Sequence, residues 1–462
     1  MPDNIKKNIG TRFTSAQIIP AGFLVLILIG AILLMLPFST AKGETTSPLT
    51  ALFTSTTSVC VTGLVVTDTF SHWSLFGKIV ILGLIQLGGL GIIAVTSLIA
   101  LLLQKRFSLR ERVLIMDAFD LTSLSGLIRF LVKVIKGTFA LELTGTAFYM
   151  IRFVPIYGPF KGLWVSFFTA VSAFCNAGLD VIGNDSLISF QDDPLLLTVT
   201  MCLIVLGGLG FVVWFDMVTG TYTAMEKHYG PIRIWKRLGE HTRLVIILTL
   251  SMIISGALLV FLLEYNNPET IGNMPLGQKI LNSFFQSITF RTAGFATVPQ
   301  QNLREATSFL GCFYMFVGGS PIGTAGGVKT VTLFVLFLNT LTYIKHKDST
   351  TALDRNINNN LIRKASAIVA VNLFITITFT ILLLITNKGL VLTDALYETT
   401  SAVATVGLSR NITPSLNGFG RIIIIVAMYL GRIGPISIAL FFTGNRSSGK
   451  KTKLAEGKFY VG

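Results

Sequence analysis

Four short segments of the chain could present backbone carbonyl oxygens to a dehydrated cation. Each runs from small and hydroxyl-bearing residues into a glycine, and the four glycines are Gly63, Gly178, Gly294 and Gly407. Their separations are 115, 116 and 113 residues. Even spacing of four similar segments indicates an internal repeat. Glycine allows backbone conformations that are closed to other residues, and so can turn carbonyls toward a common axis.

The last of these segments, SAVATVGLS (Ser401–Ser409), is the one that suggests an ion. Thr405-Val406-Gly407 matches the first three letters of the TVGYG loop, whose carbonyls replace the hydration shell of potassium in channels. For each segment taken singly, a glycine that serves close helix packing is the competing interpretation. Four evenly spaced copies favour a ring of loops.

The composition of the chain points to the lipid bilayer. Of its 462 residues 52% are hydrophobic and 13% are charged, and the mean hydropathy is +0.71, whereas a soluble domain carries about 25% charge. Apolar runs close to the spanning length of about 20 residues recur. We count eight, one of them with embedded charges and one broken by glycines: Ile18–Pro37, Ile79–Leu103, Leu131–Val154, Leu195–Met217, Leu244–Leu263, Phe309–Ile344, Ala365–Ile385 and Ile422–Phe442.

Each repeat reads as an apolar run, a short amphipathic stretch, the glycine segment and a second apolar run. The short stretches cannot cross a bilayer: Leu49–Val59, Phe167–Phe174, Leu281–Thr289 and Ala395–Val403. Irregular backbone at membrane depth is tolerated only where protein buries it or where it lines a water-filled cavity. The sequence therefore predicts an all-α polytopic membrane protein with four covalently linked span–pore-helix–loop–span repeats and pseudo-fourfold symmetry around a central pore. The expected repeats are 17–112, 113–230, 231–348 and 349–446, between cytoplasmic tails 1–16 and 447–462.

The net charge of +15 follows from membrane topology. If eight spans alternate, 25 of the 37 Lys and Arg residues lie on the side of both termini, as the positive-inside rule requires for cytoplasmic termini. We therefore expect a lipid bilayer as the partner and no nucleic acid. No nucleotide fingerprint, metal-ligand cluster or nucleophile constellation occurs, which argues against an enzyme. The cysteines all lie in or beside apolar segments, so a disulfide framework is not expected: Cys60, Cys175, Cys202 and Cys312.

The segments TSVCVTGL, SAFCNAGL, TFRTAGF and TSAVATVGL resemble the four pore loops of the bacterial Trk/Ktr and plant HKT potassium-transport superfamily. The sequences GLIQLGGLG and YLGRIGP look most like the Ktr-type membrane subunit, and the resemblance covers essentially the whole chain. It implies potassium uptake, in some members stimulated by sodium, by a homodimer in the bacterial plasma membrane. It also implies a KtrA-like ring of cytosolic regulatory subunits that binds ATP, ADP or NAD, with no cofactor on this chain.

The resemblance carries a selectivity filter onto four sets of residues. They are Val59, Cys60, Val61, Thr62 and Gly63; Cys175, Asn176, Ala177 and Gly178; Arg291, Thr292, Ala293 and Gly294; and Ala404, Thr405, Val406 and Gly407. Some plant relatives that favour sodium replace the first glycine by serine, so Gly63 favours potassium. The four loops differ in sequence, which predicts fewer ion sites than in a strict fourfold channel and more modest selectivity. Asn176, Thr62 and Thr405 either line or brace the loops.

Two features are expected below the filter. Residues Val317–Thr330 hold five glycines and a proline, which cannot sustain an uninterrupted helix. We interpret this segment as a gate loop, with a kinked helix in a static bundle as the alternative; its gate residues are Gly318, Gly319, Gly323, Thr324, Gly326 and Gly327. Arg432 is expected to project into the pore as a barrier to cations, because a charge at membrane depth is costly without water or a partner. The alternative is a salt bridge to a neighbouring helix.

Further expectations concern residues around this core. Small residues recur 24 to 29 positions after each filter glycine, beginning at Gly88, Gly207, Gly318 and Gly431, and would either widen a cavity or permit close helix crossings. Arg291 should point behind the filter, with Glu398 as a partner. The acidic residues after the second loop, Asp180, Asp185, Asp192 and Asp193, could concentrate cations at the mouth. Glu142 and Asp216 receive no role.

Two expectations concern the whole protein. The C-terminal carboxylate of Gly462 is expected at a dimer interface, as in Ktr-type relatives. The competing function is an obligatorily coupled sodium– or proton–potassium symporter with broken helices.

Overall fold

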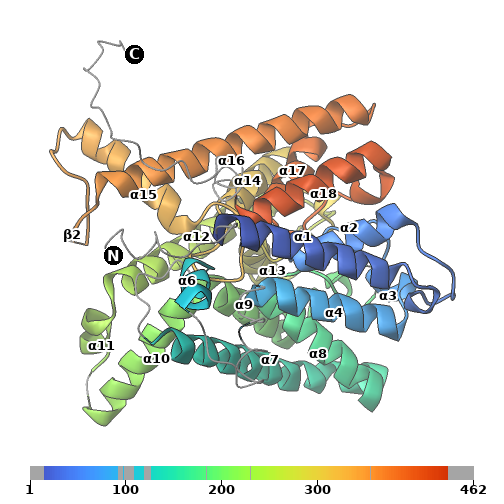
Figure 1. Ribbon diagram of the computed structural model, residues 1–462, viewed down its shortest axis with the longest axis horizontal. Helices are drawn as coiled ribbons and strands as arrows, with labels where there is room; N and C mark the ends of the chain where they lie inside the picture. Colours follow the sequence, from blue (N-terminus) through green and yellow to red (C-terminus); the bar gives the residue numbers. More distant parts are fainter. Residues whose placement is uncertain are drawn as a thin grey trace.

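The computed structural model describes residues 15–91, 97, 109–118, 126–183, 185–228, 230–353 and 355–434. Most of its helices lie side by side along one direction (Figure 1). Four helices open successive parts of the chain: α1 (Ser15–Leu34), α7 (Leu127–Tyr157), α12 (Glu240–Glu264) and α16 (Asn359–Thr386). Each is followed by a shorter helix: α2 (Pro48–Val59), α8 (Pro159–Cys175), α13 (Leu276–Thr289) and α17 (Leu392–Val403). After each short helix and a connecting loop comes another helix: α4 (Leu75–Leu90), α9 (Pro194–Leu209), α14 (Glu305–Phe316) and α18 (Gly418–Ile433).

The remaining elements connect these helices. At one end of the molecule lie α6 (Leu109–Ala118), α10 (Phe211–Glu226), α11 (Pro231–Arg237), the end of α15 (Thr330–Ile344) and the antiparallel pair β1 (Thr351–Ala352) and β2 (Arg355–Asn356), whereas α3 (Thr69–His72) lies at the opposite end (Figure 1). Four single turns complete the described chain: η2 (Pro37–Ser39), η3 (Ile188–Phe190), η4 (Gln300–Asn302) and η5 (Thr413–Ser415).

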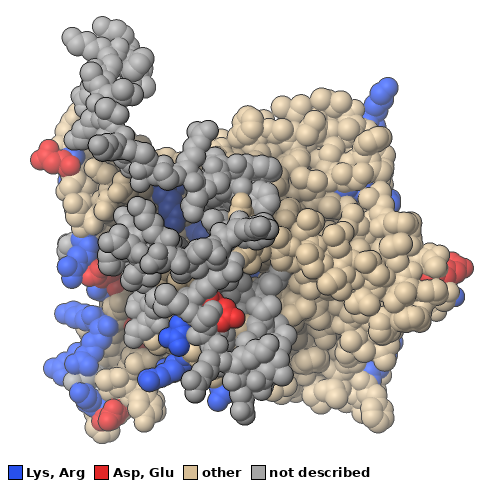
Figure 2. Space-filling model, viewed as in Figure 1, with Lys and Arg blue, Asp and Glu red and all other residues tan. Residues whose placement is uncertain are grey.

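Three described helices are long and apolar enough to cross a membrane by themselves: α1 over Gln17–Leu34, α12 and α16. Their outward faces carry exposed large apolar side chains, such as Ile254 on α12 and Phe374 on α16. Figure 2 shows the corresponding band without charges, flanked by an end where Lys and Arg gather over α10 and α11. This distribution fits a polytopic membrane protein.

The predicted span Leu195–Met217 is not one straight helix. It bends by 102° at Gly210, where α9 ends and α10 begins. Gly210 has a φ of 94°, and α4 and α18 likewise end before Gly91 and Gly434, both with a φ of 85°. The sequence interpretation, which placed a break only in the third repeat, was therefore wrong on this point: α4, α9 and α18 end at matching places before a glycine with positive φ, and α14 ends slightly earlier, at Phe316. Apart from Ser97, the rest of the predicted runs Ile79–Leu103 and Ile422–Phe442 lies outside the described residues.

The short helices form the interior and are held to the long helices by hydroxyl groups. Ser55 of α2 donates to the carbonyl of Ile27 in α1 at 2.6 Å, and Ser287 of α13 donates to that of Ile253 in α12 at 2.9 Å. In α17 the hydroxyl of Thr399 lies 2.7 Å from that of Thr380 in α16. Such polar contacts between helices replace the hydrophobic drive that is absent in lipid. They explain why the short stretches are rich in serine and threonine.

Candidate functional site

The four glycines meet head to tail in space. A side-chain carbon on Gly63 would lie 2.6 Å from the carbonyl oxygen of Ala177, and one on Gly178 would lie 2.7 Å from that of Ala293. The series continues from Gly294 to the Val406 oxygen at 2.6 Å and closes from Gly407 to the Thr62 oxygen at 2.1 Å. Each glycine thus abuts the carbonyl of the residue before the next glycine, and no larger residue fits at any of the four positions. We call these four segments the glycine loops.

The glycine loops share one backbone conformation. Their glycines have φ values of 101°, 64°, 84° and 96° in chain order. The residue two positions earlier also has a positive φ in every loop: Val61 (54°), Asn176 (59°), Thr292 (66°) and Thr405 (51°). The sequence analysis missed this second position, because only asparagine visits left-handed geometry readily and Val and Thr give no such signal.

Bonds from each loop to the preceding short helix hold this conformation. The amide of Thr62 donates to the carbonyl of Thr57 at 2.8 Å, and those of Ala177 and Val406 make the same contact with Ser172 and Ser401, both at 2.8 Å. Side chains add to it, since Gly63 N–H donates to Thr57 Oγ1 and Gly407 N–H to Ser401 Oγ, each at 3.0 Å. Strained residues persist only where their surroundings fix them in this way.

The three polar side chains assigned to line or brace the loops divide into two groups. The amide nitrogen of Asn176, in the orientation that satisfies its hydrogen bonds, donates to the carbonyls of Ala173 and Ile204 at 3.1 and 3.3 Å. Asn176 therefore braces its loop. The hydroxyl groups of Thr62 and Thr405 are buried without a hydrogen-bond partner among the described residues.

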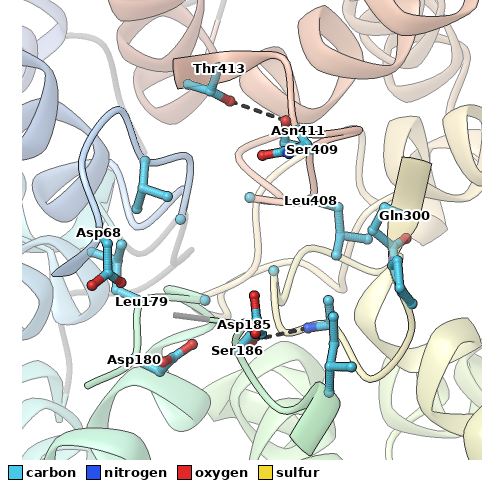
Figure 3. Close-up of a pocket in the computed structure, with 18 of the residues that line it drawn as sticks. Asp68, Leu179, Asp180, Asp185, Ser186, Gln300, Leu408, Ser409, Asn411 and Thr413 are labelled. Atoms are coloured by element: carbon cyan, nitrogen blue, oxygen red, sulfur yellow. Dashed lines mark hydrogen bonds between the residues drawn. The ribbon is translucent and has the colours of Figure 1, made fainter. Parts of the chain in front are cut away.

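A cavity of about 250 Å³ opens onto one side of the glycine loops (Figure 3). Its lining includes all four glycines together with Asp68, Asp180 and Asp185, and we call it the mouth cavity. Burial raises the pKa of Asp180 to about 6. Asp193 does not line this cavity: it accepts from two amides at the start of α9 and pairs with Arg152 at 2.5 Å. Asp68, from the first part of the chain, was not among the predicted mouth residues.

The predicted pairing of Arg291 with Glu398 is absent from the described structure. Glu398 is buried and accepts from the hydroxyls of Ser409, at 2.7 Å, and Thr413. Arg291 is buried as well, does not line the mouth cavity, and its Nε has no hydrogen-bond partner among the described residues. The pairing failed because hydroxyl groups close to Glu398 in the chain already satisfy its carboxylate.

The segment 317–330 lies against the other side of the glycine loops and is not helical between α14 and α15. Gly326 N–H donates to Thr292 Oγ1 at 3.2 Å, and a side-chain carbon on Gly326 would lie 2.0 Å from Thr405 Oγ1. The segment therefore touches the third and fourth loops on the side away from the mouth cavity, which we call the side below the loops. A continuous kinked helix, the alternative for this segment, does not form.

The same segment fills the break between α9 and α10. Ser320 and Thr324 donate their amides to the carbonyls of Gly208 and Gly207 at 3.0 and 3.1 Å. The amide of Phe211, the first residue of α10, donates to the carbonyl of Ile322 at 2.9 Å. The bend at Gly210 thus frees backbone groups that bind segment 317–330.

Arg432 reaches across to two other parts of the chain. Its guanidinium donates to the carbonyls of Thr324 at 2.7 Å and Gly88 at 2.6 Å. These partners are backbone oxygens, and no ion pair of Arg432 occurs among the described residues. The alternative of a salt bridge to a neighbouring helix is thus not found there.

The recurring small residues serve close contacts. Side-chain carbons on Gly88, Gly207 and Gly431 would lie 1.9 to 2.0 Å from carbonyl oxygens at the ends of the short helices α2, α8 and α17. Gly318 instead faces the carbonyl of Gly326 at 2.1 Å. Of the two interpretations offered for these residues, close approach is the one observed.

Apolar helices that enclose short buried helices, with four glycine loops meeting at one point, define a mostly helical polytopic membrane protein in which backbone groups of the four loops lie close together. The family described as TrkH, cation transport protein, matches residues 6–453, and the chain belongs to this family. This confirms the resemblance drawn from the motifs. The family is one of transporters and not of enzymes.

Individual relatives match over nearly the full chain. The Ktr system potassium uptake protein B of Bacillus subtilis (strain 168) is 37% identical over 451 residues, which cover 98% of this chain and 97% of the relative. The potassium/sodium uptake protein NtpJ of Enterococcus hirae is 34% identical over 448 residues, with 96% of each chain covered. The crystal structure of the potassium transporter TrkH from Vibrio parahaemolyticus has a TM-score of 0.70 at 17% identity, over 91% of this chain and 84% of that one. At this identity the likeness to the solved structure concerns the fold.

Proposed function

We propose that this chain is the ion-translocating membrane subunit of a potassium uptake system, with channel-like conduction through the four glycine loops. The observation that carries the proposal is the closed head-to-tail series of glycines and carbonyls. It supplies backbone oxygens from four segments around one point, which is the ligand arrangement that replaces the hydration shell of potassium. The names of relatives, potassium uptake protein B and potassium/sodium uptake protein, agree with this substrate.

The four parts act as repeats of one unit in this proposal. Each contributes a long helix, a short buried helix, a glycine loop and a following helix, over 17–112, 113–230, 231–348 and 349–446. The shared left-handed positions and the matching helix ends support pseudo-fourfold symmetry around a central pore. The short helices end at the loops, so that their partially negative C-termini favour a cation there.

Selectivity follows from what the loops share and where they differ. All four glycines are present, which favours potassium, while the left-handed position is Val61, Asn176, Thr292 or Thr405. Only two of these residues carry a hydroxyl group, and that of Thr292 already accepts a bond from Gly326. A lower ion site would thus have few side-chain ligands, which supports modest discrimination between potassium and sodium.

Segment 317–330 and Arg432 form the gate in this proposal. The segment lies directly below the loops. Backbone hydrogen bonds to the residues around Gly210 hold it there, and a small movement of the segment would break them. Arg432 bonds to Thr324 within the segment and to Gly88 outside it, and so fixes the closed position while placing positive charge in the cation path.

The remaining assignments rest on the family resemblance. We infer a homodimer in the bacterial plasma membrane with both termini cytoplasmic, controlled by a separate cytosolic ring that binds ATP, ADP or NAD. The side that carries α11, β1 and β2 then faces the cytoplasm. We also propose that sodium stimulates potassium uptake. The predicted position of the Gly462 carboxylate at the dimer interface concerns a residue that lies outside the described residues.

The test is ion flux into vesicles that contain the purified protein. Potassium and rubidium uptake should exceed sodium uptake. Gly407→Ala should lower potassium flux at least about tenfold, since a barrier increase of about 1.4 kcal/mol suffices and the new methyl group meets the Thr62 oxygen. Gly83→Ala is the matched control, because a side-chain carbon on Gly83 meets nothing within 4 Å.

Two outcomes would contradict this function. Potassium flux in Gly407→Ala equal to that of the wild-type protein would remove the loops from the conduction path. Saturable potassium uptake that strictly requires a second ion would favour the obligatorily coupled symporter, whereas single-channel currents would exclude it.

A further inference from the structure

Glu142 is a buried acidic residue that the proposed mechanism does not use. It lies near the middle of α7, its side chain is fully buried, and no ion pair of Glu142 occurs in the described part of the chain. An acidic group at bilayer depth is expensive and is a candidate for function by default. In sequence it appeared isolated.

The structure brings two other polar side chains to Glu142. Gln86 of α4 donates its amide nitrogen to Glu142 Oε2 at 3.1 Å. The thiol of Cys175 donates to Gln86 Oε1 at 3.6 Å and lies 4.0 Å from Glu142 Oε1. Three helices, α4, α7 and α8, thus meet in one triangle of side chains.

Cys175 connects this triangle of side chains to the second glycine loop. It is the last residue of α8 and directly precedes Asn176, whose left-handed geometry begins the second glycine loop. The thiol has little room, because a side-chain carbon on Gly89 of α4 would lie 2.6 Å from Cys175 Sγ. Because the backbone of Cys175 continues directly into Asn176, a displacement of the Cys175 backbone is passed on to the start of the loop.

The three side chains of the triangle form hydrogen bonds of different strength. A thiol is a weak donor and acceptor, whereas carboxylate and amide groups bond strongly. The bond from Gln86 to Glu142 fixes which end of the Gln86 amide faces the thiol. Without the acceptor at position 142 the Gln86 amide is free to turn, and Cys175 loses its oriented acceptor.

We propose that Glu142, through Gln86 and Cys175, is a positioning residue for the second glycine loop and helps to set the discrimination between potassium and sodium. The inference rests on the proposed function of the glycine loops. It requires the hydrogen-bond acceptor at position 142, so the neutral Glu142→Gln, whose amide oxygen can accept from Gln86, is its conservative test.

The experiment compares potassium-to-sodium permeability ratios in vesicles for Glu142→Leu, Glu142→Gln and Gln86→Leu. Glu142→Leu should change the ratio at least about threefold, a low value for groups in one hydrogen-bond network. Glu142→Gln should restore most of the wild-type ratio. Gln86→Leu should give the same change in the permeability ratio. The double variant Glu142→Leu/Gln86→Leu should change the ratio no further, because both residues act on the second glycine loop through Cys175.

Glu264 offers the matched control. It is equally buried, and accepts from Asn267, Thr270, Thr307 and the amide of Arg304 at the start of α14. Glu264→Gln should lower the melting temperature and leave the ratio unchanged. If Glu142→Leu does not fold, Gln86→Leu and Cys175→Ala test the same route.

The inference is overturned if Glu142→Leu or Gln86→Leu keeps the wild-type ratio at a lower melting temperature, or if Glu142→Gln loses the ratio as fully as Glu142→Leu. These outcomes differ from a failure of the proposed function, in which the wild-type protein itself shows no potassium flux or Gly407→Ala changes nothing.

Discussion

At the scale of single residues, Arg432 joins three parts of the chain below the glycine loops. Its guanidinium offers several donors in a rigid fork, and here they bind carbonyls of Thr324 and Gly88. Among the described residues this charge has carbonyl groups as partners, and its bond to Thr324 ties it to segment 317–330. In the proposed function the charge would repel cations and the bond would hold the segment in place, and both effects would oppose conduction.

Arg432→Ala should therefore raise potassium flux, by about tenfold or more if the lost contacts and charge lower the barrier by about 1.4 kcal/mol. The potassium flux of Arg432→Lys should lie between that of the wild-type protein and that of Arg432→Ala, because an ammonium group keeps the charge but cannot bind both carbonyls at once. Vesicle flux at fixed protein content measures this. Flux equal to that of the wild-type protein in Arg432→Ala would exclude the barrier.

The sequence predicted the residues of the loops better than their partners. The glycine positions were evident because only glycine tolerates the close approach that each loop requires. The pairing of Arg291 with Glu398 was wrong because Ser409 and Thr413 compete for the carboxylate. The link from Glu142 to Cys175 spans three helices, and no pattern along the chain records such a contact.

At the scale of elements, segment 317–330 and the breaks in α4, α9 and α18 belong together. The sequence revealed the segment because its glycines and proline interrupt an apolar run. It did not reveal the bend at Gly210, because the residues directly before and after that glycine are apolar and hydropathy reports composition, not direction. The freed amide of Phe211 then binds Ile322 of the segment.

Deletion of Ile322–Ala325 should give high and poorly regulated potassium flux. The deletion removes the contacts to Gly207 and Phe211 and withdraws the chain from below the loops. Thr324→Val is the milder comparison: it keeps the backbone and removes only the bond from Thr324 Oγ1 to the Phe174 carbonyl at 3.2 Å, so its effect should be smaller. A deletion variant that is folded, by its melting curve, but conducts no potassium would contradict the role of a gate.

At the scale of the whole molecule, the charges distinguish the two ends. Basic residues gather at the end with α11 (Figure 2), and α11 by itself carries Arg233, Lys236 and Arg237. The mouth cavity at the glycine loops is lined by Asp68, Asp180 and Asp185 (Figure 3). An acidic mouth that faces outward would attract cations toward the loops, and a basic inner rim fits retention by the positive-inside rule. Both charge patterns predict the same orientation.

Cysteine labelling tests this orientation on the full protein. Cys60, Cys175 and Cys312 are buried, so Cys202→Ala provides a background without an exposed thiol among the described residues. In intact cells a membrane-impermeant maleimide should label Lys42→Cys, between α1 and α2, and should not label Thr351→Cys in β1. In inverted vesicles the pattern should reverse. Labelling of Thr351→Cys in intact cells would place the acidic mouth inside, and the glycine loops would then receive cations from the cytoplasm, which is incompatible with an uptake system that is gated from below.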